Sequence, residues 1–211
     1  IYEELVRMHK EEKLSFRNVV IFSVYEYYPL TKDSGSNLQL LKDLLLDHID
    51  IDWRNVFSPD GEVAKDQLLS YCKNYEDKIQ SFGGIDYLLL GIGRGGNIGV
   101  NIPGSNINSQ TRLILLDNQS RKEAINTFGS LDKVPVRAIT MGLSTMLKAK
   151  KITLVAWGED KANSVKDVVE GQQSDAIPAS WLQNHPKAQV FVDLSAAYDL
   201  TRISKPWLVT S

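Results

Sequence analysis

The amino-acid sequence predicts an α/β fold in which a mostly parallel, Rossmann-like sheet carries helices on both faces. Two observations support this class: apolar runs of strand length recur along the chain, and amphipathic helical segments separate them. Continuous apolar strands that alternate with helices are typical of a parallel sheet covered on both sides. The chain has 211 residues, the length of one domain with a full hydrophobic core, so residues 1–211 are interpreted as a single domain.

The first half of the chain opens on a helical pattern. Apolar residues from Ile1 to Met8 recur with helical spacing, and no capping residue precedes them. We therefore expect that residues 1–211 are a fragment of a longer chain and that the first strand of the sheet precedes Ile1. A β-branched and aromatic run and two amphipathic segments follow. They predict a strand over 18–27 and helices over 37–48 and 63–82.

The second half of the chain alternates strands with helices. Short runs rich in Leu, Ile and Val predict strands, and the segments between them have helical spacing. The predicted strands are 85–93, 111–117, 152–157 and 188–194, and the predicted helices are 120–129 and 159–171. This order favours parallel strands, because a helix between two strands returns the chain to the same end of the sheet.

The composition argues against several classes of partner. Hydrophobic residues make up 43% and charged residues 24% of the chain, as in soluble globular proteins. The net charge is −2 and the Lys and Arg residues are dispersed, which disfavours nucleic acid or an anionic membrane as partner. No apolar run approaches the roughly 18 residues of a membrane span. The single cysteine, Cys72, excludes an internal disulfide and a thiolate metal cluster, and a cytoplasmic location fits.

A glycine-rich turn closes the predicted strand 85–93. Gly91, Gly93 and Gly96 form the pattern G-x-G-x-x-G. A nicotinamide dinucleotide site would need a helix directly after the third glycine, but the next residues include further glycines and Pro103, so NAD is disfavoured. A loop of backbone N–H groups at the carboxyl end of a parallel strand suits an oxyanion, and a tight loop without a ligand is the alternative.

The same loop resembles the signature of the glucosamine-6-phosphate deaminase/isomerase family. LLLGIGRGGNIGVNIPGS, residues 88–105, is similar to the family form G-[IV]-G-x-D-G-H-I-A-F-N-E-P. VIFSVYEYYPL resembles the family strand that ends in D-E-Y, SQTRLILLDNQSR its T-R-x-x-x-L segment, and AWGEDKA its G-x-x-K-A element. VVEG and LQNHPKA resemble its closing elements. The resemblance covers nearly all of the chain and is nearest to a Bacteroidetes-type variant in which this domain precedes a deacetylase-like domain.

This resemblance implies a reaction of amino-sugar metabolism. Family enzymes open the ring of glucosamine 6-phosphate, move a proton between C2 and C1, and release ammonia to give fructose 6-phosphate. The chemistry uses a carboxylate as the base at C2 and a histidine that shuttles the ring-oxygen proton. It implies a small-molecule sugar phosphate as partner, no metal and no organic cofactor. A fused deacetylase-like domain, and a second copy of this chain that fills the gap of the first strand, are the protein partners considered.

The proton-handling residues of the family are replaced in this chain. The resemblance places the aspartate base at Tyr25, the loop aspartate at Gly95, the histidine at Asn97 and the later glutamate at Ile102. None of these side chains titrates near neutral pH. Glu26 is a substitute base, but neighbours on a strand point to opposite faces, so it faces away unless a bulge turns the strand. Tyr25, Glu26 and Asn97 are therefore the candidate catalytic residues.

The substrate-binding residues of the family are better represented. Lys161 corresponds to the family lysine that pairs with the substrate phosphate, near the start of a predicted helix, where anions are favoured. The candidate substrate-binding residues are Gly91, Gly93, Gly96, Asn97, Asn101 and Lys161. Two hypotheses follow. One is an isomerase/deaminase whose activity is weak or lost, and the other is a non-catalytic sugar-phosphate-binding or scaffolding domain that regulates a fused partner.

Overall fold

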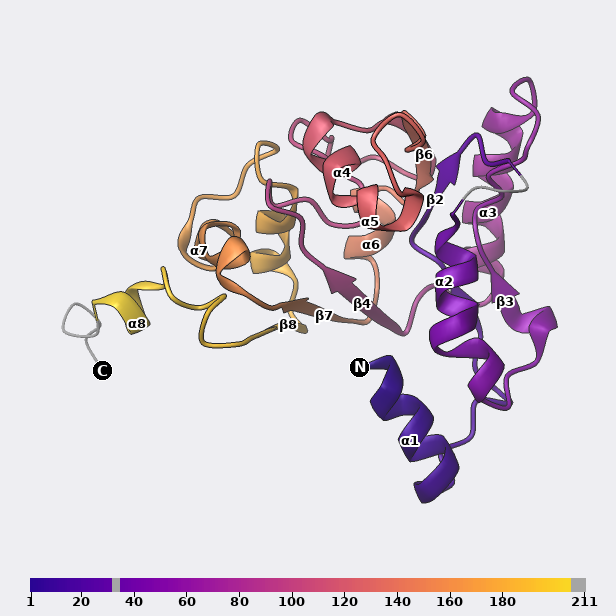
Figure 1. The fold of residues 1–211 in the computed structure, drawn as a ribbon, viewed down its shortest axis with the longest axis horizontal. Coiled ribbons are helices and arrows are strands. Elements are labelled where there is room, and N and C mark those ends of the chain that lie inside the picture. The colour runs from indigo at the N-terminus through magenta and orange to yellow at the C-terminus, as the bar shows by residue number, and fades with distance from the viewer. Residues whose placement is uncertain (32–34, 206–211) are drawn as a thin grey trace.

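The computed structural model describes residues 1–31 and 35–205, whose arrangement Figure 1 shows. The chain forms three groups of hydrogen-bonded strands, with helices packed around them. The α/β class agrees with the sequence. The strands, however, are a mixture of parallel and antiparallel pairs rather than mostly parallel.

Two strand groups are parallel and one is antiparallel. The parallel groups are β1 (Ile21–Phe22) with β3 (Val56–Phe57), and β4 (Tyr87–Gly91), β7 (Lys151–Ala156) and β8 (Ala188–Val192) in the order β4-β7-β8. The antiparallel group is β2 (Tyr25–Tyr28), β6 (Arg137–Thr140) and β5 (Arg112–Leu115) in the order β2-β6-β5. The parallel prediction is wrong for β2 and β5, because β6, a strand that the sequence pattern did not reveal, runs between them in the opposite direction.

Most α-helices lie in the predicted helical segments with shifted ends, but the helices over 143–147 and 201–204 were not predicted. The α-helices of the described residues are α1 (Tyr2–Glu12), α2 (Asn37–Leu44), α3 (Leu68–Ser81), α4 (Asn118–Glu123), α5 (Ile125–Phe128), α6 (Leu143–Leu147), α7 (Ala162–Glu170) and α8 (Thr201–Ser204). The 3-10 helices are η1 (Leu46–His48), η2 (Trp53–Asn55), η3 (Glu159–Lys161) and η4 (Pro178–Asn184). The segment predicted as one helix over 120–129 therefore belongs to two short helices, α4 and α5.

The predicted strand 18–27 is divided between two strand groups. The backbone N–H of Ser23 donates to the carbonyl of Phe57 at 2.8 Å, which keeps this residue with β1 and β3. The carbonyl of the next residue, Val24, accepts from the N–H of Met141 at 2.9 Å, which ties it to the end of β6. The chain thus changes partner just before β2, and β2 places Tyr25 and Glu26.

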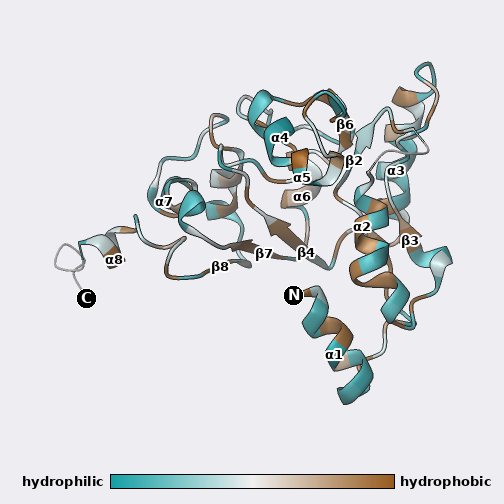
Figure 2. Cartoon of the chain, in the orientation of Figure 1, coloured by the Kyte–Doolittle hydropathy of each residue, from teal (hydrophilic) through white to brown (hydrophobic). Residues whose placement is uncertain are grey.

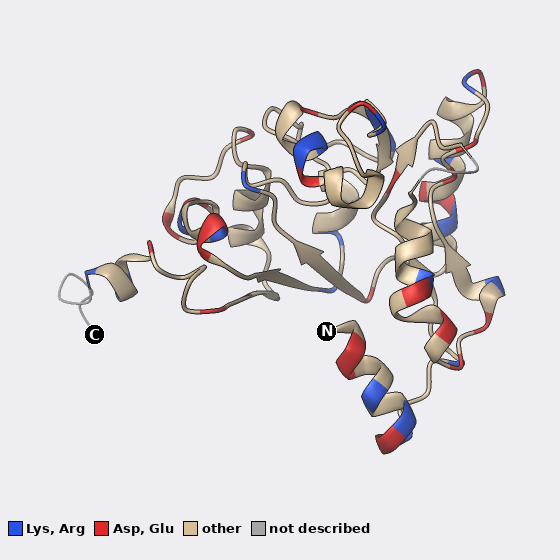
Figure 3. Ribbon diagram, in the orientation of Figure 1, with Lys and Arg blue, Asp and Glu red and all other residues tan. Residues whose placement is uncertain are grey.

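The main hydrophobic core lies on one face of the β4-β7-β8 group. Leu88 and Leu90 of β4 and Ile152 and Leu154 of β7 are almost fully buried there with residues of α6, α7 and η4. Figure 2 shows the hydrophobic colour gathered on β4 and β7. Figure 3 shows acidic and basic residues interspersed along the helices, in line with the net charge of −2. In the part of the chain that the structure describes, no helix has the length and apolar character needed to cross a bilayer.

The β4 strand lies at the edge of its group. Within the described residues its only hydrogen-bonded neighbour is β7. A cavity of about 1000 Å³ is lined by β4 together with residues 18–25. Tyr87, at the start of β4, exposes 53% of its surface. This cavity extends to the loop that follows β4, where the candidate site lies.

Candidate functional site

The loop after β4 turns tightly at the carboxyl end of the parallel group, as the sequence predicts. The N–H of Gly96 donates to the carbonyl of Gly93, and the N–H of Gly93 donates to the carbonyl of Asn97, both at 3.0 Å. Gly96 has a φ of +72°, and a Cβ added there would lie 2.6 Å from Cγ2 of Ile177. Position 96 therefore requires glycine, and the turn brings Asn97 back against Gly93.

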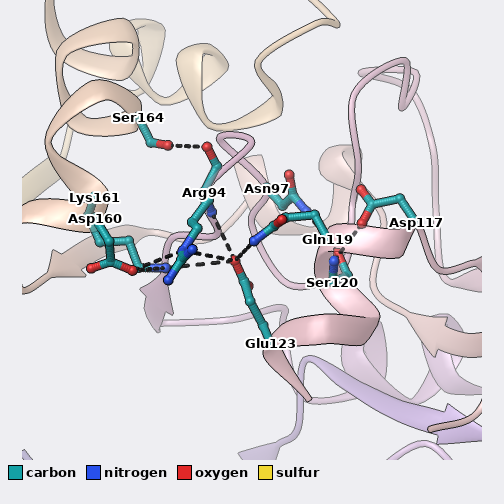
Figure 4. Close-up of polar contacts among 9 residues, drawn as sticks. All are labelled: Arg94, Asn97, Asp117, Gln119, Ser120, Glu123, Asp160, Lys161 and Ser164. Carbon is teal, nitrogen blue, oxygen red and sulfur yellow. Dashed lines mark hydrogen bonds and ion pairs between the residues drawn. The ribbon is translucent and has the colours of Figure 1, made fainter. Parts of the chain in front are cut away.

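Asn97 lies in the wall of the cavity and is nearly fully buried. Its Nδ2 donates to Oγ of Ser120 at 3.1 Å (Figure 4). Its Oδ1 is buried and has no hydrogen-bond partner among the described residues. An unpaired buried acceptor is costly, so this oxygen is a ready partner for a donor such as a sugar hydroxyl or ammonium.

Tyr25 lines the same cavity from β2. Burial raises the pKa of its phenol, and the nearby carboxylates of Glu26 and Glu123 act in the same direction. The hydroxyl therefore stays protonated near neutral pH, where it can donate a hydrogen bond. In this state Tyr25 cannot accept a proton as a general base.

Glu26, the other candidate base, points away from the cavity and into the start of α2. It is 1% exposed, and its carboxylate accepts from Oγ of Ser36 at 2.7 Å and from the N–H groups of Asn37 and Leu38 at 3.0 Å each. A further bond comes from the N–H of Tyr27 at 2.9 Å. The residue thus satisfies the free N–H groups of a helix N-terminus, where a carboxylate is favoured. Strand alternation, without a bulge, accounts for its direction.

Asn101 is a structural residue of the loop. It is completely buried, and its Nδ2 donates to the carbonyls of Ile98 at 3.0 Å and Met141 at 2.9 Å. Its Oδ1 accepts from Nη1 of Arg112 at 2.9 Å. Asn101 therefore fastens the loop to the end of β6 and to β5, and it does not line the cavity formed by the described residues.

Lys161 belongs to a cluster of four charged side chains that we call the charge cluster: Arg94, Glu123, Asp160 and Lys161 (Figure 4). The Nζ of Lys161 lies 3.6 Å from Oδ2 of Asp160 and 4.0 Å from Oε1 of Glu123. The Nε of Arg94 lies 3.1 Å from the same Asp160 oxygen and 3.9 Å from the same Glu123 oxygen. Lys161 and Gly91 also line a smaller cavity of about 450 Å³.

The structure brings together part of the predicted site. Tyr25, Gly91, Gly93 and Asn97 line one cavity. The other predicted positions are absent from its lining in the described residues: Glu26, Gly95, Gly96, Asn101, Ile102 and Lys161, of which Lys161 lines the smaller cavity. Sequence reasoning missed Ser120, Glu123 and Arg94. Arg94 lies inside the predicted loop, so its position could have marked it as a candidate site residue. No spacing rule links it to Glu123.

We next consider whether the described part of the chain could bind a metal ion. No group of three or more His, Cys, Asp or Glu side chains there is placed to hold an ion. Cys72 is buried beside Tyr28, Leu68 and Ile139, as a packing residue would be.

Comparison with known proteins decides the family. Residues 1–192 match the family model described as glucosamine-6-phosphate isomerases/6-phosphogluconolactonase. The glucosamine-6-phosphate deaminase of Bacillus velezensis is 42% identical over 93% of this chain and 81% of its own length. A solved monomeric glucosamine-6-phosphate deaminase superposes with a TM-score of 0.90 at 38% identity, over 94% of this chain and 82% of that one. The chain belongs to the glucosamine-6-phosphate deaminase/isomerase family.

The lengths of these deaminase/isomerase relatives differ. A Bacteroides thetaiotaomicron protein described as glucosamine-6-phosphate deaminase-like is 61% identical over all of this chain, which spans 32% of that protein.

The 6-phosphogluconolactonase of Trypanosoma brucei shares the fold at a TM-score of 0.72 and 18% identity. Its likeness extends to the fold alone.

Four positions of this chain correspond, by the resemblance, to proton-handling positions of the family. Tyr25 and Asn97 lie on the cavity wall, whereas Gly95 and Ile102 are absent from its lining in the described residues. A Cβ added at Gly95 would lie 2.8 Å from Oδ1 of Asn97. An aspartate at position 95 would therefore require the side chain of Asn97 to move. Because this oxygen is the far end of the Asn97 side chain, a rotation of that side chain relieves the contact.

Proposed function

We propose that this domain binds a hexosamine phosphate at the carboxyl end of β4 and carries out the family reaction very slowly or not at all. The observation that carries the proposal is the chemistry of the groups facing the cavity there. Tyr25, Asn97 and Ser120 are neutral near pH 7, and the pKa of Tyr25 is raised further by burial. These groups can hold a sugar through hydrogen bonds but cannot move its protons.

The carboxylates nearest to the site are already engaged. Glu26 accepts four hydrogen bonds at the start of α2 and in β2. Glu123 lines the cavity but also accepts from Nε2 of Gln119 at 3.2 Å and lies near Arg94 and Lys161. Asp86 lines the far end, before β4, and pairs with Lys150 at 2.6 Å.

The expected loss of rate is large. The base at C2 and the ring-opening shuttle are each worth about 10²–10⁴ in rate. Losing both raises the barrier by at least ~5 kcal/mol. Binding need not be lost with them, because it rests on Lys161, the loop amides around Gly91, Gly93 and Gly96, and the Oδ1 of Asn97, which no described residue engages.

We further propose that a strand outside residues 1–211, preceding Ile1, pairs with the free edge of β4. The edge position of β4 and the adjoining cavity of about 1000 Å³ support this. The solved deaminase also extends beyond the matched region, since this chain covers 82% of it. A fused deacetylase-like domain and a cytoplasmic location stay predictions; the B. thetaiotaomicron relative is about three times as long as the part it shares with this chain.

The test is a coupled assay on the full-length protein with glucosamine 6-phosphate, in which ammonia and fructose 6-phosphate are both measured. The B. velezensis deaminase is the positive control, and calorimetric titration measures binding separately from turnover. We expect weak binding with a turnover at least 10⁴-fold below the control. Binding without turnover would support the non-catalytic binding domain, and turnover close to the control would refute the proposal.

A further inference from the structure

We propose that Arg94 is a second phosphate-binding cation beside Lys161, and that Glu123 and Asp160 hold both cations in a closed, charge-neutral latch that a phosphate ester must open. This rests on the proposed function, because it concerns the same site. It adds three residues, Arg94, Glu123 and Asp160, for which the signature positions assign no role.

Three elements that are distant in sequence bring the charge cluster together. Arg94 comes from the loop after β4, Glu123 from the end of α4, and Asp160 and Lys161 from η3. The backbone of Arg94 is anchored on both sides: its carbonyl accepts from Oγ of Ser164 at 2.6 Å, and its N–H donates to Oε1 of Glu123 at 3.4 Å. The guanidinium is thus directed along the same surface as Lys161, as Figure 4 shows.

The two carboxylates neutralise the two cations. Two positive and two negative side chains sum to zero, so the closed cluster offers no net attraction to an anion. A phosphate monoester carries about −1.5 to −2 charges near pH 7. If the carboxylates turn to solvent, the same place presents two positive groups, and the Arg94 fork suits phosphate oxygens.

The latch is built from contacts that a ligand can exchange. Three of its four ion pairs are 3.6 Å or longer, and only that between Arg94 and Asp160, at 3.1 Å, is a hydrogen bond. The side chains of Arg94 and Asp160 are 54% and 43% exposed, and that of Glu123 is 33% exposed. Exposed ion pairs of this kind are weak. Lys161, at 19%, is the most enclosed of the four and is the fixed point of the proposed site.

The experiment titrates full-length protein with inorganic phosphate and, separately, with glucosamine 6-phosphate at low ionic strength. The variants are Glu123→Gln, Asp160→Asn, Arg94→Ala and the double variant Glu123→Gln/Arg94→Ala. Glu159→Gln is the matched control, because it removes one negative charge from an exposed neighbour of the cluster. Lys122→Ala is the control for loss of a cation on α4. Circular dichroism confirms that each variant is folded.

We expect Glu123→Gln to tighten binding of both ligands about five- to tenfold, as removal of one unit charge near 4 Å predicts. Asp160→Asn should act in the same direction, Glu159→Gln should change affinity less than twofold, and adding Arg94→Ala should cancel the gain. The inference is overturned if Glu123→Gln behaves like Glu159→Gln, if Arg94→Ala acts like Lys122→Ala, or if no folded variant binds either phosphate. If Glu123→Gln tightens inorganic phosphate while the sugar phosphate binds no better than inorganic phosphate, the latch stands and the proposed sugar recognition fails.

Discussion

The two ends of the candidate site differ in burial and in charge. Around Tyr25 and Asn97 the wall is half-buried to buried and, apart from the carboxylate of Glu123, neutral; one oxygen of Asn97 has no partner among the described residues. Around Lys161 the side chains are half-exposed, charged and mutually paired. A buried neutral wall cannot gain the capacity to move protons without new side chains, whereas exposed ion pairs rearrange when an anion arrives. Under the proposed function, proton transfer and phosphate recognition change independently within this family.

The largest expected difference is the one in turnover between this protein and an active relative, and it concerns the end of the site around Tyr25 and Asn97. Asn97→His alone should restore no turnover, because the ring-opening shuttle is of no use while position 25 lacks a base. The ammonia-coupled assay should give the same rate for this variant and the unmodified protein. The activation free energy of both should be at least ~5 kcal/mol higher than that of the B. velezensis deaminase. A rise of about 100-fold or more from this single change would show that a base is already present and would break the comparison.

The next effect concerns the edge of β4 and the cavity beside it. A longer protein that includes the segment before Ile1 should melt at least ~5 °C above residues 1–211, because a strand on the free edge of β4 satisfies backbone groups and fills the cavity. Calorimetry measures the melting temperatures, and size-exclusion chromatography checks whether residues 1–211 close the gap by self-association. Equal melting temperatures of two monomers would contradict the proposal.

Glu26 tests whether the buried carboxylate is structural or catalytic. Glu26→Gln should lower the free energy of unfolding by about 2 kcal/mol, because the start of α2 loses a charged acceptor. Glu159→Gln, at an exposed position, is the control and should change it little. Urea denaturation measures both. A variant of unchanged stability that loses a measurable residual turnover would instead assign the base to Glu26.

The smallest expected effect lies at the charged end. Lys161→Ala should weaken binding of glucosamine 6-phosphate at least tenfold, about 1.4 kcal/mol, which takes a weak ligand below detection. Lys122→Ala should leave binding unchanged. Binding of glucosamine without its phosphate should respond to neither variant. If Lys161→Ala loses binding of glucosamine as well as of glucosamine 6-phosphate, the lysine contacts the sugar rather than the phosphate.

Much of the local structure follows from the sequence. The apolar runs correctly predict β4, β7 and β8, and the glycines of the loop predict the turn at the end of β4, because strand periodicity and positive φ angles are properties of short segments. The motifs also identify the family. The alternation of side chains along a strand predicts that Glu26 faces away from Tyr25, although it does not reveal the helix start that Glu26 caps.

Other features depend on contacts between distant segments. β2 and β5 each pair antiparallel with β6, which lies between them. β6 has only four residues, too few for its pattern to be recognised in the sequence. The pair of Arg94 and Glu123 joins residues 29 positions apart, and that of Arg94 and Asp160 joins residues 66 apart. Local periodicity carries no information on such pairs, since register and packing of whole elements set the distances. The sequence by itself thus determined the family and the loop, and it predicted a site without titrating groups; only the tertiary structure decided that Lys161 lies within 4.0 Å of two carboxylates.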